Sequence, residues 1–292
     1  MNNFLGLIRP YISLMKLRII VLLLITATGS LFVVSKGVPN WTITIAVLVG
    51  GALIAGGANC INQYLDRDID AIMPRTQKRP IPSNLISGTN TLLFGLFLTL
   101  IGFVFLSTLA NVLSAVCAFI GSLFYIFVYT IWLKRRSSQN IVIGGAAGAV
   151  PPLVASLAVT NEITVNAWLM FLLIFLWTPP HFWALALIMK DDYKRANIPM
   201  LPVVKGEEFT RWNILGYSII LILFNSVVMW FFGDDIGVIY IVVSLIFSFV
   251  FTFLAIILLR SPSLLFAKRL YKYSIVYLAA LFLTFIIDVI VI

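Results

Sequence analysis

The stretch VLSAVCAFIGSLFYIFVYTIWL, residues 112–133, contains no charged residue and is followed at once by Lys134, Arg135 and Arg136. A helix needs about 20 apolar residues to cross a bilayer, and this stretch is long enough. It is continuously apolar and lacks the two-residue alternation that is typical of strands in a membrane barrel. The stretch therefore predicts a membrane-spanning helix that ends at a basic boundary.

The same pattern recurs along the whole chain. Of its 292 residues, 61% are hydrophobic and 11% are charged, whereas soluble domains carry about 25% charged residues. The mean hydropathy is +1.07. We predict an all-α integral membrane protein, a bundle of nine transmembrane helices that forms a single membrane domain over residues 1–292. The expected spans are 19–34, 41–60, 91–109, 112–133, 141–160, 167–189, 212–232, 236–259 and 274–291.

The basic residues predict how these spans are oriented. If the chain crosses nine times, every Lys and Arg except Lys36 falls on the same side as the N-terminus. Since Lys and Arg gather on the cytoplasmic side, we expect a cytoplasmic N-terminus. The net charge of +9 is spread over short gaps between spans, which argues against a nucleic-acid partner. Two expected cytoplasmic loops, about 61–90 and 190–211, are longer than a turn requires and are therefore candidates for function.

The first of these loops begins with an acidic motif. Asn62, Asp66 and Asp70 are spaced by four residues, so on a helix they stack on one face, while Asp68 points away. Neighbouring carboxylates repel each other, which favours a bound cation, and Mg²⁺ binds carboxylates together with substrate phosphates. A solvated helix end of mixed charge is the alternative, but it gives no reason for the asparagine one turn earlier.

A second polar group follows the sixth expected span. Asp191 and Asp192 form another carboxylate pair at the membrane edge, which indicates either a second magnesium site or an ordinary charged loop. His181, the single histidine, follows Pro179-Pro180 within that span. A buried histidine is expensive in a membrane. It indicates either a hydrogen-bonded group inside the bundle or a haem ligand or proton acceptor.

Several motifs together resemble the UbiA superfamily of intramembrane prenyltransferases, and within it the branch that acts on haem. The resemblance covers about residues 10–290. It rests on NCINQYLDRDID (59–70), YTIWLKRR (129–136), QNIVIGGAAG (139–148), PHFW (180–183) and the segment 197–205.

Two positions depart from the superfamily pattern. Arg195 stands where many members repeat the acidic residue of a second motif, so Asp191 and Asp192 are expected to serve instead. This pattern resembles the haem branch and argues against a benzoate or naphthoate acceptor. Leu17 replaces the proline of an early motif but leaves both of its cations, Lys16 and Arg18, in place.

The resemblance implies a reaction and a set of site residues. Farnesyl diphosphate would donate its chain to a vinyl group of haem b, with addition of water, giving haem O and diphosphate. His181 is expected to position haem. The catalytic residues and ligands of Mg²⁺ would be Asn62, Asp66, Asp70, Asp191 and Asp192. The expected partners of the diphosphate oxygens are Lys16, Arg18, Lys78, Arg79, Tyr129, Lys134, Lys190 and Lys194.

The site is expected to lie at the cytoplasmic side of a multi-pass cell membrane protein. A haem A synthase or a terminal oxidase assembly is an expected partner. Two other readings remain open: prenyl transfer to an aromatic quinone precursor, and ion-coupled transport. Transporters place their ion-binding groups near the bilayer midplane, whereas nearly every carboxylate of this chain falls at a membrane edge.

Overall fold

The computed structural model describes residues 2–232 and 236–291, and the regular elements in this part of the chain are all helices. The long helices are α2 (Leu17–Ser35), α4 (Gly51–Leu65), α6 (Gly88–Leu109), α10 (Val165–Ile188), α13 (Glu207–Phe232), α14 (Val238–Arg260) and α15 (Leu264–Val291). The shorter ones are α1 (Asn2–Leu14), α3 (Trp41–Ile45), η1 (Ala46–Gly50), α5 (Arg67–Ile72), α7 (Val112–Leu123), η2 (Phe124–Leu133), α8 (Asn140–Gly144), η3 (Gly145–Ala149), α9 (Pro151–Thr160), α11 (Lys190–Arg195) and α12 (Leu201–Val204).

Within the described ranges, nine helical segments are long and apolar enough to cross a membrane, which confirms the predicted number of spans. The span Val112–Leu133 has the predicted bounds. The last span differs most, because α15 begins at Leu264, ten residues before the predicted start. Its first turns carry Lys268, Arg269 and Lys272, so the helix extends beyond its apolar part.

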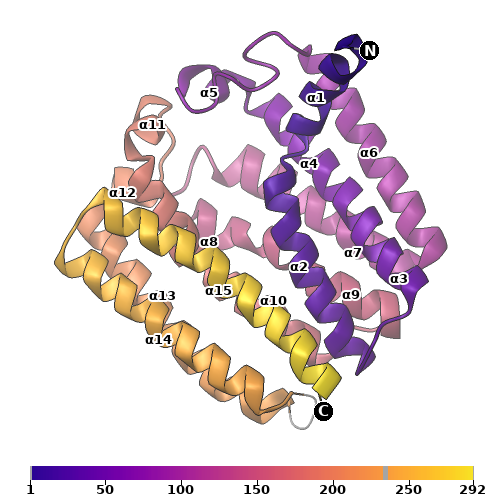
Figure 1. Ribbon diagram of the computed structural model, residues 1–292. Coiled ribbons are helices and arrows are strands. Elements are labelled where there is room, and N and C mark those ends of the chain that lie inside the picture. The colour runs from indigo at the N-terminus through magenta and orange to yellow at the C-terminus, as the bar shows by residue number, and fades with distance from the viewer. Residues whose placement is uncertain (1, 233–235, 292) are drawn as a thin grey trace.

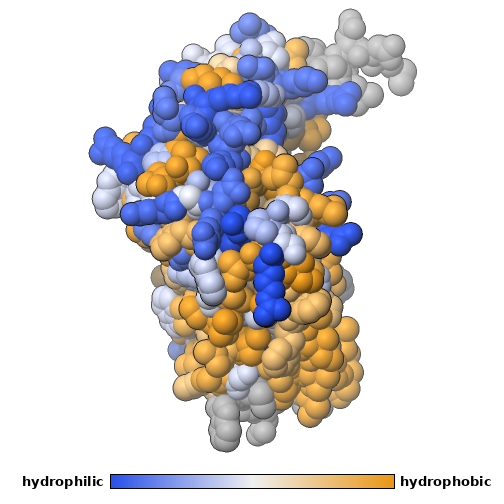
Figure 2. Space-filling model, turned by 90° about the vertical axis from the view of Figure 1, so that its left-hand side faces the viewer, coloured by the Kyte–Doolittle hydropathy of each residue, from blue (hydrophilic) through white to orange (hydrophobic). Residues whose placement is uncertain are grey.

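Polar and apolar residues separate along the long axis of the molecule. Helix α1 and the short helices α5 and α11 lie at one end of the bundle, and α15 finishes at the other (Figure 1). The end that carries α5 and α11 is hydrophilic on the face seen in Figure 2, whereas the opposite part is mostly hydrophobic. We call the first of these the polar end. Both expected functional loops contribute to it: α5 lies in the first, and α11 and α12 in the second.

Helices α4 and α6 approach each other closely through glycines. A Cβ atom on Gly57 would lie 2.3 Å from Thr99 Oγ1 and 2.5 Å from the carbonyl oxygen of Gly95. Gly102 and Gly50 meet in the same way nearer the other end of the bundle. Small residues allow membrane helices to pack backbone against backbone where no hydrophobic force drives them together. This contact fixes the position of α4 along the bundle, and the last turn of α4 carries Asn62, the first residue of the acidic motif.

We expect Gly57→Val to separate α4 from α6 and to lower the free energy of unfolding by about 1–3 kcal/mol, the usual cost of overpacking. Gly51→Ala in the same helix is the control, because its Cβ would meet no atom within 4 Å. Thermal unfolding in detergent measures both. Equal midpoints for the two variants would contradict the close packing of α4 on α6.

Candidate diphosphate-binding site

The acidic motif lies where α4 bends into α5. Helix α4 ends at Leu65, and Asp66, with φ −91° and ψ 5°, joins it to α5. The N–H of Asp70 still donates to the carbonyl oxygen of Asp66 over 2.8 Å. The motif thus spans two helices joined at Asp66, and the four-residue hydrogen bonding of a helix continues across the junction.

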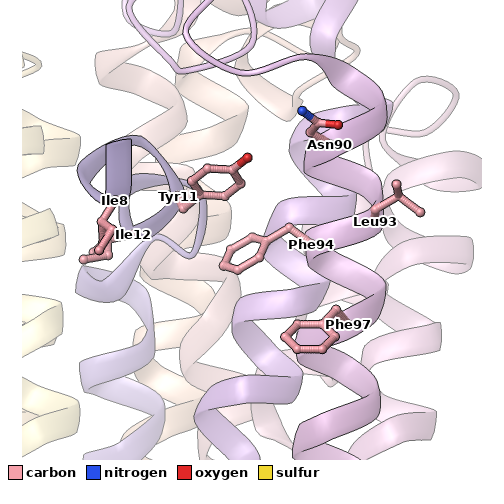
Figure 3. Close-up of a pocket in the computed structure, with 7 residues that line it drawn as sticks. All are labelled: Ile8, Tyr11, Ile12, Asn90, Leu93, Phe94 and Phe97. Atoms are coloured by element: carbon pink, nitrogen blue, oxygen red, sulfur yellow. The ribbon is translucent and has the colours of Figure 1, made fainter. Parts of the chain in front are cut away.

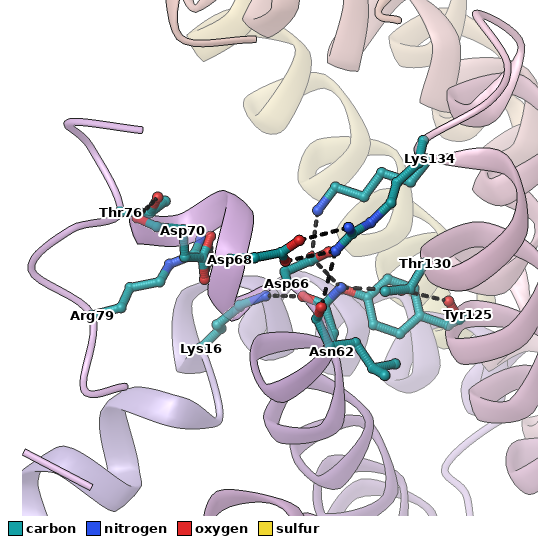
Figure 4. A network of polar contacts seen from close by, with 12 residues as sticks. Lys16, Asn62, Asp66, Asp68, Asp70, Thr76, Arg79, Tyr125, Thr130 and Lys134 are labelled. Atoms are coloured by element: carbon teal, nitrogen blue, oxygen red, sulfur yellow. Dashed lines mark hydrogen bonds and ion pairs between the residues drawn. The ribbon is translucent and has the colours of Figure 1, made fainter. Parts of the chain in front are cut away.

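A buried polar network surrounds Asp66 (Figure 4). Lys134 forms an ion pair with Asp66 Oδ2, and Asn62 Nδ2 donates to the same oxygen over 2.8 Å. Asn62 also donates to Thr130 Oγ1 over 3.1 Å and accepts a hydrogen bond from Lys16 Nζ over 2.8 Å. Lys134 and Asn62 therefore contact the carboxylate directly, Lys16 and Thr130 contact it through Asn62, and the side chain of Asp66 is 1% exposed.

The other two aspartates of the motif have different surroundings. Asp70 is 3% exposed, and Arg79 Nη1 donates to both of its oxygens over 2.8 and 2.7 Å. The side chain of Asp68 is 59% exposed and pairs with Arg135 on the surface. This hydrogen-bonded guanidinium lowers the pKa of Asp68. The sequence prediction that Asp68 points away from its neighbours agrees with this placement.

One oxygen of this network has no partner. Asp66 Oδ1 is buried without a hydrogen bond among the described residues. A buried carboxylate oxygen that is left unpaired is costly and is a candidate ligand for a cation. In the described parts of the chain, no three His, Cys, Asp or Glu side chains gather closely enough to hold a metal by themselves. The five-residue ligand set expected from the sequence therefore stays a prediction.

Lys16 lies at the junction between α1 and α2 in a left-handed conformation, with φ 55° and ψ 54°. Such a backbone is uncommon for a residue other than glycine and costs energy. Burial lowers the pKa of Lys16 to about 7, and the nearby charges of Arg79 and Lys134 add to this effect. Near neutral pH, Lys16 is therefore present in both its charged and its neutral form.

The second loop packs over the first. Ile198 and Met200 share a buried cluster with Ile69 and Met73 of the first loop, and Tyr129 and Tyr193 pack against it. Burial also raises the pKa of Tyr193. These contacts hold the loop that carries Asp191 and Asp192 beside α5.

The remaining candidates from the sequence lie outside the network around Asp66. Asp191 is exposed and Asp192 is partly buried. Lys190 pairs with Glu207 over 2.7 Å instead of facing the acidic motif. Three further cations lie exposed on the surface: Arg18, Lys78 and Lys194. Their roles toward a diphosphate remain predictions.

His181 is buried between α10 and α15, with 6% of its surface exposed. Its Nδ1 atom lies 2.6 Å from Ser274 Oγ. The ring stacks on Trp177, with centroids 4.3 Å apart, and on Tyr271 at 4.9 Å. This geometry agrees with one of the two interpretations of the sequence, a hydrogen-bonded histidine inside the bundle. A role of His181 toward haem stays a prediction.

Two features of the site are invisible in the sequence pattern. Residues 124–133 form the π-helix η2, in which Thr130 Oγ1 reaches the carbonyl oxygen of Tyr125 and Lys134 N–H reaches that of Tyr129. This wider helix places Thr130 and Lys134 beside Asn62 and Asp66, and π-helical turns are frequent at functional sites. Asn140 is fully buried, and neither atom of its amide group has a partner among the described residues.

A surface groove of about 600 Å³ lies apart from these residues (Figure 3). It runs between α1 and α6 and contains none of the side chains expected in the site. Its lining is almost entirely apolar: Ile8, Tyr11, Ile12, Asn90, Leu93, Phe94 and Phe97.

Residues 22–286 match the UbiA prenyltransferase family over most of the chain. The chain belongs to this family. Two relatives, each named protoheme IX farnesyltransferase, are 45% identical over 284 residues (Symbiobacterium thermophilum) and 46% identical over 288 residues (Trichodesmium erythraeum). These matches cover 97% and 98% of this chain, and 94% and 88% of the relatives. A third, from Roseiflexus castenholzii, is 43% identical, and the chain spans about half its length, 52%.

Solved structures of other UbiA proteins share the fold. Digeranylgeranylglyceryl phosphate synthase superimposes with a TM-score of 0.79 at 20% identity, over 98% of this chain and 99% of that one. A UbiA homologue from Archaeoglobus fulgidus bound to GPP and Mg²⁺ gives 0.67 at 18% identity, over 97% and 98%. This chain therefore shares the fold of these two proteins.

The lowered pKa of Lys16 predicts a pH-dependent stability. Between about pH 7 and 10.4 the folded protein has lost the Lys16 proton while the unfolded chain keeps it, so the free energy of unfolding rises with pH. Lys16→Met removes this contribution. We expect thermal unfolding in detergent to show the wild type gaining stability over Lys16→Met from pH 7 to 9. A difference that is constant with pH would contradict the burial of this amine.

Proposed function

We propose that this chain transfers the farnesyl group of farnesyl diphosphate to a vinyl group of haem b, with addition of water, releasing diphosphate and giving haem O. The observation that carries the proposal is its similarity, over nearly its full length, to relatives named protoheme IX farnesyltransferase. The buried acidic and basic network at the polar end supplies chemistry suited to a diphosphate.

The network is suited to Mg²⁺ at one point above all. Asp66 Oδ1 is a buried carboxylate oxygen without a partner among the described residues, and Asn62 and Asp70 lie four residues before and after Asp66. We propose these three residues as magnesium ligands, with Asp191 and Asp192 brought to the same diphosphate by the second loop. Bound magnesium would neutralise the charge that develops on the leaving diphosphate.

Three cations of the chain lie ready for the diphosphate. Lys16, Lys134 and Arg79 are paired with Asn62, Asp66 and Asp70. Their charges stabilise carboxylates that would otherwise be buried unpaired. We propose that they turn toward the phosphate oxygens when the substrate arrives and leave the carboxylate oxygens to the metal. Lys16, with a pKa of about 7, would gain a proton as the anion binds.

The aromatic residues beside the network suit an allylic cation. Tyr125 and Tyr129 stack with centroids 5.5 Å apart on η2. The faces of aromatic rings attract cations, more strongly where water is excluded. We propose that these rings lie along the farnesyl chain near its reacting carbon, while the buried His181 positions haem.

The proposed orientation places the polar end in the cytoplasm, together with the N-terminus, because Lys and Arg concentrate on that side of membrane proteins. The diphosphate group would then stay at the cytoplasmic interface, while the farnesyl chain and haem enter from the bilayer. We propose a haem A synthase or a terminal oxidase assembly as the recipient of the product.

The test uses purified protein in detergent with haem b, farnesyl diphosphate and Mg²⁺, and mass spectrometry of the products. We expect a product with the mass of haem plus a hydroxyfarnesyl group, which EDTA abolishes. If the folded protein gives no such product, haem is not the acceptor, and aromatic quinone precursors are to be tested next.

Asp66→Ala and Asp70→Ala are expected to lower product formation at least a hundredfold. Each removes a buried carboxylate, a proposed magnesium ligand, and leaves its lysine or arginine partner without an ion pair. Asp68→Ala is the matched control from the same motif, since its side chain is exposed and its ion pair, with Arg135, lies on the surface. It is expected to keep nearly full activity. The assay is the product yield above, with thermal unfolding as the measure of folding. Near-normal activity of Asp66→Ala or of Asp70→Ala would show that the aspartate it replaces is not part of the site.

A further inference from the structure

Ser274 of α15 contacts Nδ1 of His181, the only histidine of the sequence, through its hydroxyl group. Its hydroxyl lies 2.6 Å from His181 Nδ1 and 2.7 Å from the carbonyl oxygen of Tyr271. A serine hydroxyl has one hydrogen to donate, and a carbonyl oxygen can only accept. Both short contacts are hydrogen bonds only if the hydroxyl donates to Tyr271 and accepts from the imidazole. The proton of the neutral ring is therefore on Nδ1.

The other ring nitrogen is then an unprotonated acceptor. In the described part of the chain, the side chain of His181 hydrogen-bonds through Nδ1 alone, so its Nε2 atom has no partner there. A neutral imidazole with its proton on Nδ1 presents the Nε2 lone pair, the form in which histidine binds metals. Histidine ligands usually donate their other N–H to a group that fixes the tautomer and the direction of the ring. Ser274 occupies the place of that group.

The surroundings of the ring hold this direction fixed. Trp177 and Tyr271 stack on the imidazole and fix the plane of the ring, and the contact with Ser274 fixes which edge of the ring faces α15. Trp177 Nε1 also donates to the carbonyl oxygen of Ser274 over 2.8 Å, which fixes α10 against α15 at this height. A histidine that served packing alone would need neither a fixed tautomer nor a free second nitrogen.

We propose that Ser274 is a positioning residue, which holds His181 in the Nδ1–H tautomer and directs Nε2 at the iron of the bound haem. This inference rests on the proposed function, because haem is the proposed substrate that carries a metal. His181 would be the ligand, and Ser274 acts only through it. The contact would orient the macrocycle and so select which vinyl group meets the farnesyl chain.

Resonance Raman spectroscopy of ferrous haem b bound to the purified protein tests the proposal. The wild type is expected to show an iron–histidine stretching band that is absent in His181→Ala and returns with added imidazole. Ser274→Ala is expected to shift this band and to weaken haem binding about tenfold, the lower end of the usual effect of removing the partner of a ligating histidine. Ser274→Thr, which keeps the hydroxyl, is expected to retain the band.

Ser218→Ala is the matched control. Ser218 is also fully buried and donates to the carbonyl oxygen three residues before it, over 2.8 Å, but it contacts no histidine. It is expected to leave the band and the haem affinity unchanged while altering thermal stability as much as Ser274→Ala does. This separates a role toward the ring from a role in packing.

An unaltered band and affinity in Ser274→Ala, or an iron–histidine band that survives in His181→Ala, overturns the inference. Product formation by the wild type is measured separately. If the wild type makes no farnesylated haem, the proposed function fails. If it does, and Ser274→Ala behaves as the wild type does, only the role of Ser274 fails.

Discussion

A buried carboxylate at the end of a membrane helix is the constraint on which the polar end of this protein depends. Asp66 has a side chain that is 1% exposed, and Lys134 and Asn62 both reach the same oxygen of it. An isolated charge in such a place is costly, and removing one partner of a buried ion pair costs about 3–5 kcal/mol. The surrounding helices are packed so that Lys134 and Asn62 both contact this carboxylate.

This requirement accounts for several departures from regular helix geometry. Lys16 reaches Asn62 from a left-handed junction between α1 and α2. Lys134 and Thr130 reach the site from a π-helix. The chain bends at Asp66, which lets Asp70 face Arg79. The left-handed backbone of Lys16 is strained, and such strain persists where the surrounding structure demands it, often at functional sites.

The sequence predicts the membrane bundle well because length and apolar composition are local properties. Val112–Leu133 can be identified as a span without any knowledge of its neighbours. The start of α15 at Leu264 cannot, because its first turns carry lysines and arginines and lie beyond the apolar part. The four-residue spacing of the acidic motif correctly separates the exposed Asp68 from the buried Asp66 and Asp70.

The pairings within the site could not be predicted from the sequence. Nothing in the sequence indicates that Lys134 pairs with Asp66, or that Arg79 takes both oxygens of Asp70, because these contacts depend on how separate helices pack. The sequence alone predicts Lys134 and Arg79 as partners of the substrate only. In the structure they also act as counter-ions of the carboxylates. Ser274 was missed for the same reason, since it meets His181 across 93 positions of sequence.

The central claim is that the chain's own cations occupy the carboxylates until a diphosphate draws them away. Calorimetric titration of Mg²⁺ into the purified protein, without and with farnesyl diphosphate and in the absence of haem, tests this most directly. A titration of Mg²⁺ into farnesyl diphosphate alone is subtracted. We expect weak binding of Mg²⁺ alone and at least tenfold tighter binding when the diphosphate is present. Equally tight binding without the diphosphate would contradict it.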